Sequence, residues 1–208
     1  MATPVIDFWF DFGSPNAWLA HAVLPGIAER TGAEVVWRPM LLGGVFKATG
    51  NQSPVQAFGH LPAKLAWLGQ ARQRFCEVYG VPYGGNEHFP VNTLTLMRGA
   101  LWVRDALGEA GFARYVDAMF RCMWIDGRKM DDDAVLVEAL GEHGFEGDAF
   151  LEGIQRPEVK QGLVEATETA VAAGVFGAPS CVVGDQLFFG KDDIFLMESW
   201  LRLGADRG

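Results

Sequence analysis

A serine at the start of a helix is the most chemically suggestive residue near the N-terminus. Residues 5–12 are mostly apolar and predict a buried strand, and Ser14 and Pro15 follow almost directly. Ser14 is a good N-cap because its hydroxyl can accept a hydrogen bond from a free backbone N–H of the first turn, and Pro15 suits the first helical position. The positive end of the helix dipole then lies at Ser14. The stretch predicts either a plain helix cap or a place where the protein holds an anion.

A second stretch, near the other end of the chain, also places a proline at the start of a predicted element. Residues 174–183 read GVFGAPSCVV, so Pro179 comes just before a predicted strand. This proline resembles the cis-proline of thioredoxin folds, in which the turn faces the start of the first helix. Ala178 would then offer its backbone N–H and C=O to a peptide-like ligand, as an added strand would. Taken alone, the stretch is better interpreted as an ordinary turn into a strand, but its pairing with Ser14 and Pro15 at the other end of the chain favours the cis-proline turn.

The predicted elements give the order β-α-β, a block of helices, and then α-β-β-α. The first three form a unit whose two strands are parallel and joined by a right-handed crossover. The expected strands lie at residues 5–12, 33–39, 180–183 and 186–189. The expected helices lie at residues 14–30, with a kink at Pro25, and at 62–79, 92–107, 112–125, 131–142, 148–155, 157–174 and 191–203. Glycines and prolines after residue 42 predict a long loop that serves a site or hides a short element.

This order predicts an α/β fold of the thioredoxin-like type with an inserted all-helical domain. Residues 1–42 and 172–208 would form the discontinuous thioredoxin-like domain, and residues 43–171 the helical insertion domain. With 208 residues, of which 50% are hydrophobic, the chain is long enough to bury a substantial core. Because both chain ends contribute strands to one sheet, we expect Ser14 to lie close to Pro179.

The composition argues against several classes of function. A net charge of -9 without a block of lysines or arginines disfavours nucleic-acid binding. No signal segment or membrane-length apolar run appears, so we expect a cytoplasmic protein that binds no membrane. The cysteines, Cys76, Cys122 and Cys181, form no C-x-x-C motif, which indicates free thiols in a reducing compartment. The four histidines are scattered without ligand spacing, so we expect no metal site.

Four groups of motifs follow one another along the chain. They are FDFGSP at 10–15 with WLA at 18–20, FPVNT at 89–93 with LMR at 96–98, GVFGAP at 174–179, and FGKD at 189–192. In this order they resemble the motifs of 2-hydroxychromene-2-carboxylate isomerases and kappa-class glutathione transferases, which are DsbA-like proteins with serine in place of the first cysteine of C-x-x-C. The resemblance spans essentially the whole chain. It is specific for this superfamily and less specific between isomerase and transferase.

The resemblance implies glutathione as the cofactor and Ser14 as the catalytic residue. Ser14 would donate a hydrogen bond to the glutathione sulfur while the helix N-terminus adds its positive potential, and both favour the thiolate, which is the nucleophilic form. Because serine cannot form a disulfide, the site would carry out no redox exchange of its own. The residues implied in glutathione binding are Ser14, Asn51, Lys64, Ala178, Pro179, Gly190, Lys191 and Asp192.

The implied activity interconverts 2-hydroxychromene-2-carboxylate and trans-o-hydroxybenzylidenepyruvate, in aromatic hydrocarbon catabolism, through reversible thiolate addition. The partner would be a small aromatic 2-oxo acid, and the negative oxygen formed during the reaction needs a donor. Lys47 and Lys64 are the candidate donors, and Lys47 and Asn92 the expected substrate contacts. Candidate flat walls for an aromatic substrate are Trp9, Trp37, Phe46 and Trp67, of which we expect at least two to be core residues.

The chain departs from the family pattern at two places. Asp193 stands where the family usually has an arginine that could hold a carboxylate, and Lys191 beside it can substitute only as a point charge. Residues 16–18, NAW, stand where aromatic residues or serines are commoner, which would reshape the substrate side.

Other functions stay open. The alternative enzyme is a kappa-class-like transferase that conjugates glutathione to electrophiles, and the alternative of another class is a non-catalytic glutathione- or peptide-binding module. A disulfide oxidoreductase is disfavoured because Cys181 has no partner in C-x-x-C spacing. We expect a homodimer, as in relatives.

Overall fold

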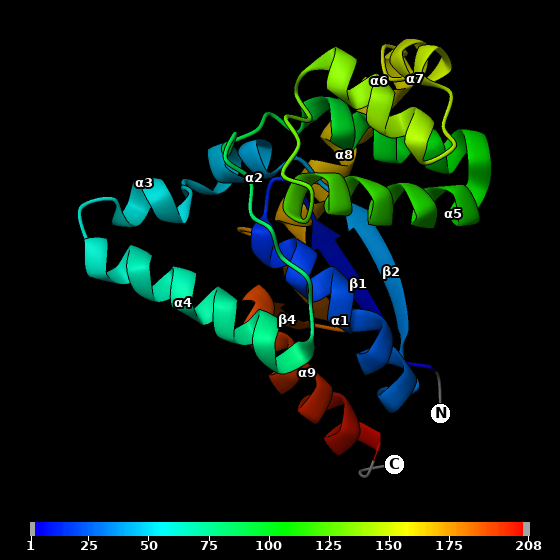
Figure 1. Ribbon diagram of the computed structural model, residues 1–208. Coiled ribbons are helices and arrows are strands. Elements are labelled where there is room, and N and C mark those ends of the chain that lie inside the picture. Colours follow the sequence, from blue (N-terminus) through cyan, green and yellow to red (C-terminus); the bar gives the residue numbers. More distant parts are fainter. Residues whose placement is uncertain (1–2, 206–208) are drawn as a thin grey trace.

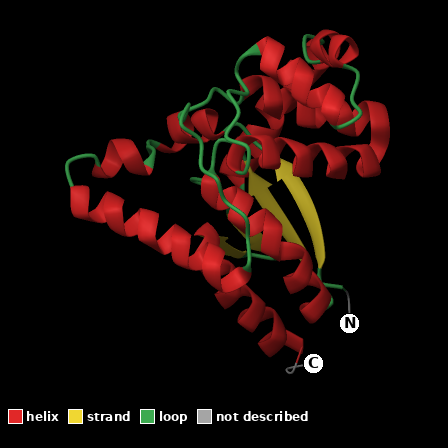
Figure 2. Ribbon diagram, in the orientation of Figure 1, coloured by secondary structure: helices red, strands yellow, loops and turns green. Residues whose placement is uncertain are grey.

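A mixed sheet lies at the centre of the computed structural model, which describes residues 3–205. Its strands in that part are β1 (Val5–Phe10), β2 (Glu34–Pro39), β3 (Ser180–Val183) and β4 (Gln186–Phe189), in the order β2-β1-β3-β4 (Figure 1). β1 and β2 are parallel, whereas β3 is antiparallel to both β1 and β4. Figure 2 shows this sheet enclosed by helices. The thioredoxin-like fold is confirmed, and β1 ends at Phe10, earlier than predicted.

The central strand β1 brings the two ends of the chain together. Trp9, near the end of β1, pairs with Ser180 at the start of β3. Because these strands are antiparallel, the turn that follows β1 and the turn that precedes β3 lie at the same end of the sheet. Ser14 and Pro179 are carried by these two turns, so the topology places them side by side.

The helices lie close to their predicted positions. Those in the described part are α1 (Pro15–Thr31), α2 (Leu42–Thr49), α3 (Pro54–Phe58), α4 (Pro62–Tyr79), α5 (Leu94–Trp124), α6 (Asp133–Glu142), α7 (Gly147–Gly153), α8 (Pro157–Ala172) and α9 (Gly190–Ala205). α1 continues through Pro25, and Asp132 rather than Asp131 caps α6. No helix of residues 3–205 combines the length and the hydrophobicity that a membrane crossing needs.

The region after residue 42 hides short elements, which is one of the two alternatives that the sequence left open, because α2 and α3 occupy much of it. Glycine disfavours helix, and Gly43 and Gly44 therefore pointed to a loop. At Gly44, however, an added Cβ would lie 2.9 Å from Cγ2 of Thr167 in α8. The absence of a side chain lets α2 approach α8 closely, and this packing overrides the local preference.

The two helices predicted at 92–107 and 112–125 are merged in α5. Gly108 lies between them with φ 68° and ψ -174°, which is not a helical conformation. Glycine adopts a positive φ without steric cost, so the chain changes direction here without leaving the helical region. The predicted break is therefore present as a single residue rather than as a loop.

The side chains of β1 alternate between two cores. Phe8 and Phe10 are fully buried in the larger core, whereas Trp9 lies in a smaller core with Met40 and Ala170 of α8. This is the period of two expected for a strand buried on both faces. On the side of the larger core, α1 packs against α9.

The larger core joins the sheet to helix α5, which comes from the middle of the chain. Phe10 and Phe12 both contact Phe120 of α5, with ring centroids 5.6 Å and 4.9 Å apart. In Figure 1, α5, α6 and α7 gather at one end of the sheet, while α3 and α4 extend along one side. The division into residues 1–42 with 172–208 and residues 43–171 stays a prediction about folding units.

Candidate active site

Ser14 caps α1 as the sequence predicts. It has extended backbone angles, φ -101° and ψ 114°, and its Oγ accepts a hydrogen bond from the N–H of Ala17 at 3.2 Å. Pro15 occupies the first turn, and the first turn of α1 contains no acidic side chain. The positive end of the helix dipole is therefore not neutralised within this turn and lies at Ser14.

The two stretches singled out in the sequence are joined by a hydrogen bond. The hydroxyl of Ser14 donates to the carbonyl oxygen of Ala178 at 3.0 Å, and the bond between Ala178 and Pro179 is cis. Gly190, which starts α9, donates its N–H to the carbonyl oxygen of Pro179 at 2.9 Å. The predicted cis-proline turn and its position against the start of α1 are confirmed.

A cavity of about 720 Å³ opens over Ser14 and Ala178. This volume is within the range of small-molecule sites, which are mostly apolar with a few polar groups. Aromatic side chains from four regions of the chain line it: Phe46, Phe58, Trp67, Tyr83, Phe89, Trp124, Phe176 and Phe189. The cavity therefore suits a ligand with a flat apolar part.

The candidate walls divide as expected between the cavity and the core. Phe46 and Trp67 line the cavity. Trp9 is 5% exposed and belongs to the smaller core. Trp37 packs edge-on against Phe8 and donates a hydrogen bond to Nδ1 of His21 at 3.0 Å.

Among the residues that the structure describes, two cationic side chains line the cavity, and one of them, Lys191, was predicted. Lys191 is 5% exposed, and its Nζ lies 2.5 Å from Oδ1 of Asp192, so its charge is already paired. Arg72 of α4 lies over the ring of Tyr83, 5.1 Å from its centroid, and forms no ion pair within residues 3–205. Arg72 has the helical spacing of Leu65 and Leu68, which also line the cavity, and this spacing is the sequence signal that could have identified it.

Asn51, Gly190 and Asp192 also line the cavity, as their predicted role requires. Asn51 donates a hydrogen bond from its side-chain amide to the carbonyl oxygen of Phe176 at 2.7 Å, which links the loop after α2 to the turn before β3. Asp193, the departure from the family pattern, accepts a hydrogen bond from the N–H of Phe189 at 3.0 Å. Its carboxylate therefore stabilises the start of α9 and is not part of the cavity lining.

Four predicted site residues lie outside the cavity lining. Lys64 is exposed, and its Nζ lies over the ring of Phe58, 3.6 Å from the centroid, so it touches a wall of the cavity from outside. Asn92 is exposed and accepts a hydrogen bond from Leu94 at the start of α5. Pro179 is buried behind Ala178. Lys47 lines a different groove, between α2, α5 and α8.

A buried carboxyl group behind the site was missed by sequence reasoning. Asp11 is 1% exposed and accepts hydrogen bonds from the N–H groups of Gly13 and Leu42 and from the hydroxyl of Thr93, at 2.7–2.8 Å. Burial raises the pKa of this carboxyl, and the three hydrogen bonds oppose that shift. Asp11 ties the turn that carries Ser14 to α2 and α5. An acidic residue in a mostly apolar stretch was the available signal, but Asp7 gives the same signal and forms a partly exposed ion pair with Arg38.

The thiols of the chain are not activated. Burial raises the pKa of Cys76, raises that of Cys122 to about 11, and raises that of Cys181 further. A thiol with a raised pKa is protonated at neutral pH and is a poor nucleophile. The described residues also contain no group of three His, Cys, Asp or Glu side chains that could hold a metal ion.

Comparisons with known proteins agree with the thioredoxin-like fold. The family described as the DSBA-like thioredoxin domain matches residues 5–202. A 2-hydroxychromene-2-carboxylate isomerase of Sphingobium xenophagum is 31% identical over 199 residues, which cover 96% of this chain and 98% of that protein. Glutathione S-transferase kappa 1 of Homo sapiens is 25% identical over 216 residues, covering 94% and 92%. A solved 2-hydroxychromene-2-carboxylate isomerase has a TM-score of 0.82 at 28% identity, covering 98% and 99%.

Proposed function

Because the chain belongs to the family of 2-hydroxychromene-2-carboxylate isomerases and kappa-class glutathione transferases, within the DsbA-like thioredoxin domains, we propose that it is a glutathione-dependent isomerase. Its reaction would interconvert 2-hydroxychromene-2-carboxylate and trans-o-hydroxybenzylidenepyruvate. The isomerase is preferred to the transferase because the isomerase relatives are more similar in sequence. The observation that carries the proposal is the Ser14 hydroxyl, held at a helix N-terminus beside Ala178 in an aromatic cavity.

The residues around Ser14 fit a tripeptide thiol. The carbonyl oxygen of Ala178 has two lone pairs, and Ser14 uses one, so the other can accept the backbone N–H of a ligand. Lys191 and Asp192 line the cavity and provide one charge of each sign. A γ-glutamyl group carries both a carboxylate and an amino group, so it would extend this existing ion pair with charges of the opposite order.

Ser14 would hold the thiol in its ionised form. Rotation about its Cβ–Oγ bond redirects the hydroxyl proton from the Ala178 oxygen towards a sulfur atom in the cavity. A hydrogen bond to the charged form and the positive end of α1 both lower the pKa of that thiol. Each unit of this shift corresponds to about 1.4 kcal/mol of differential stabilisation.

Bound glutathione would supply a thiol nucleophile that adds reversibly to a conjugated double bond and frees it to rotate. Negative charge then develops on the former keto oxygen of the substrate, and a donor is needed there. Arg72 is the best candidate, because it lines the cavity and its charge is unpaired among residues 3–205. Lys47 is no longer the preferred donor, since it lines another groove. Phe46 and Trp67 would lie against the aromatic ring.

A kappa-like glutathione transferase is the second candidate. The same Ser14 arrangement serves it, and the aromatic cavity also suits an apolar electrophile. The relative named glutathione S-transferase kappa 1, which matches over most of the chain, favours this alternative.

Two assays separate these candidates. The first follows conversion of 2-hydroxychromene-2-carboxylate with and without glutathione, and the second follows conjugation of glutathione to 1-chloro-2,4-dinitrobenzene. We expect rapid isomerisation only when glutathione is present, and slow conjugation. Conjugation without isomerisation would select the transferase. Glutathione binding in calorimetry without either activity would leave a binding module.

A further inference from the structure

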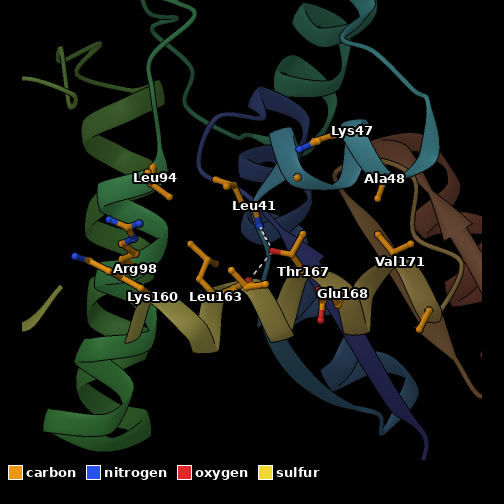
Figure 3. Close-up of a pocket in the computed structure, with 13 residues that line it drawn as sticks. Leu41, Lys47, Ala48, Leu94, Arg98, Lys160, Leu163, Thr167, Glu168 and Val171 are labelled. Atoms are coloured by element: carbon orange, nitrogen blue, oxygen red, sulfur yellow. Dashed lines mark hydrogen bonds between the residues drawn. The ribbon is translucent and has the colours of Figure 1, made fainter. Parts of the chain in front are cut away.

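A second hollow lies on the opposite side of α2 from Ser14. It is an open groove of about 680 Å³ between α2, α5 and α8. Figure 3 shows α5 with Leu94 and Arg98 on one side, α2 with Lys47 and Ala48 on the other, and α8 between them. Leu42 and Phe46 line the Ser14 cavity, whereas Gly44, Lys47 and Ala48 line this groove, so the two hollows use different faces of one helix.

The floor of the groove is apolar, and the hydroxyl of Thr167 within it already has hydrogen-bond partners. The apolar lining consists of Leu41, Leu94, Leu163, Val164, Val171 and Ala172. Thr167 accepts a hydrogen bond from the N–H of Leu41 at 3.0 Å and donates one to the carbonyl oxygen of Leu163 at 2.7 Å. A ligand on this floor would therefore meet hydrocarbon and would displace no protein hydrogen bond.

The rim of the groove carries an excess of positive charge. Lys47, Arg98 and Lys160 line it, against the single carboxylate of Glu168. None of these three cations forms an ion pair with another residue in the range 3–205. Nε of Arg98 is also buried without a hydrogen-bond partner in that range, and such groups are rare in folded proteins. In a chain of net charge -9, this local excess is complementary to an anion.

We propose that this groove binds a small organic anion that combines one carboxylate with an apolar body the size of an aromatic ring. The apolar body would lie on the leucine and valine floor, and the carboxylate would meet Arg98 and Lys160, which stand on the same side of the groove in Figure 3. An arginine binds a carboxylate through two parallel N–H donors, which suits the half-buried Arg98. The proposal does not depend on glutathione or on the reaction at Ser14.

Calorimetric titration with 4-phenylbutyrate tests the proposal, with 4-phenylbutyramide as the probe of the same shape without charge. We expect the carboxylate to bind and the amide to bind at least about fivefold more weakly, since one charge-assisted contact contributes on the order of a tenfold change in affinity. Arg98→Gln and Lys160→Gln should each weaken carboxylate binding about fivefold. Ala48→Trp, which fills the groove and keeps its charges, should also weaken it.

Lys129→Gln is the matched control, because Lys129 is exposed and does not line the groove. It should bind 4-phenylbutyrate as the unaltered protein does. Thermal unfolding identifies any variant that fails to fold. If Arg98→Gln does not fold, Lys160→Gln, on the rim, still tests the proposal. Equal affinity for acid and amide, equal affinity in all variants, or no binding of the acid at millimolar concentration would overturn the proposal.

Discussion

The hydroxyl of Ser14 donates a hydrogen bond of 3.0 Å to the carbonyl oxygen of Ala178, although 164 positions separate the two residues in the chain. The same Oγ accepts a hydrogen bond from Ala17, so one atom caps α1 and fastens it to the turn before β3. The hydroxyl has a single proton. A thiolate that accepts a hydrogen bond from this hydroxyl must compete with the carbonyl oxygen of Ala178, and the outcome sets how far the site lowers the pKa of a bound thiol.

Replacing Ser14 by alanine should destabilise the fold. The change removes a helix cap and leaves the Ala178 carbonyl without this donor, so we expect the free energy of unfolding to fall by about 1–2 kcal/mol. Denaturant unfolding measures this loss. Ser53→Ala is the comparison, because Ser53 caps the short α3 through a bond to Gln56 within the same helix. A loss at Ser14 no larger than that at Ser53 would mean that the bond to Ala178 contributes nothing.

The buried carboxyl of Asp11 should give stability a characteristic dependence on pH. Its folded-state pKa is raised by burial above the unfolded value, so the folded protein binds the proton more tightly. The contribution of Asp11 to stability is therefore present below the unfolded pKa of about 3.8 and is lost as the pH rises through the folded pKa. In Asp11→Asn this loss is absent.

Unfolding free energies of both proteins across the acid range test this account of Asp11. Asp11→Asn should be less stable than the unaltered protein at low pH. Its amide NH₂ group can donate but not accept a hydrogen bond, so it loses either the bond from the N–H of Leu42 or the two bonds that Oδ1 accepts. The deficit relative to the unaltered protein should shrink as the pH rises. A constant deficit at every pH would show that the carboxyl has the same pKa in both states.

Removing the charge of Arg72 should lower kcat/KM for isomerisation and leave the fold intact. If Arg72 meets the negative oxygen or the carboxylate of the substrate, Arg72→Gln should lower kcat/KM for isomerisation about 10–100-fold, the size expected for a charged hydrogen bond. Arg74→Gln is the matched control, since Arg74 lies on the same helix, is exposed and does not line the cavity. Equal kinetics for the two variants would remove Arg72 from the mechanism.

The homodimer stays a prediction, and α9 offers a surface for it. Leu196, Trp200 and Leu203 are 62%, 42% and 52% exposed and follow one another at helical spacing. We propose that this stripe packs against a second copy of the chain. Light scattering during gel filtration should then give a dimer mass for the unaltered protein and a monomer mass for Leu196→Glu. Leu107→Glu is the control, because Leu107 is 49% exposed and lies on α5, outside the stripe, and it should keep the dimer mass. A dimer that withstands the change at Leu196 would place the interface elsewhere.

The sequence predicts those parts of the site that rest on local signals. Ser14 with Pro15 is a capping pattern, and Pro179 stands just before a strand, so both positions could be read from neighbouring residues. Their contact follows from the antiparallel pairing of β1 and β3, which the order of the elements already suggests.

The remaining residues depend on how helices are placed against the sheet. Lys47 and Phe46 are adjacent in sequence, yet Phe46 lines the Ser14 cavity and Lys47 lines the second groove. Which of them meets which hollow depends on how α2 packs against α8. On α4, Arg72 lines the Ser14 cavity, whereas Arg74 is exposed and lines neither hollow. Local periodicity gives the faces of a helix but not the cavity that each face meets.

The pKa of the glutathione thiol in the complex tests the central claim most directly. Ultraviolet absorption of the thiolate, followed against pH, gives this value for the unaltered protein, for Ser14→Ala and for Ser14→Thr, which keeps the hydroxyl. We expect the bound thiol to titrate below the value of about 8.5 for a free thiol, and to return towards it by about one unit in Ser14→Ala but not in Ser14→Thr. The same thiol pKa in Ser14→Ala and in the unaltered protein would contradict the proposed role of Ser14 in keeping the thiol ionised.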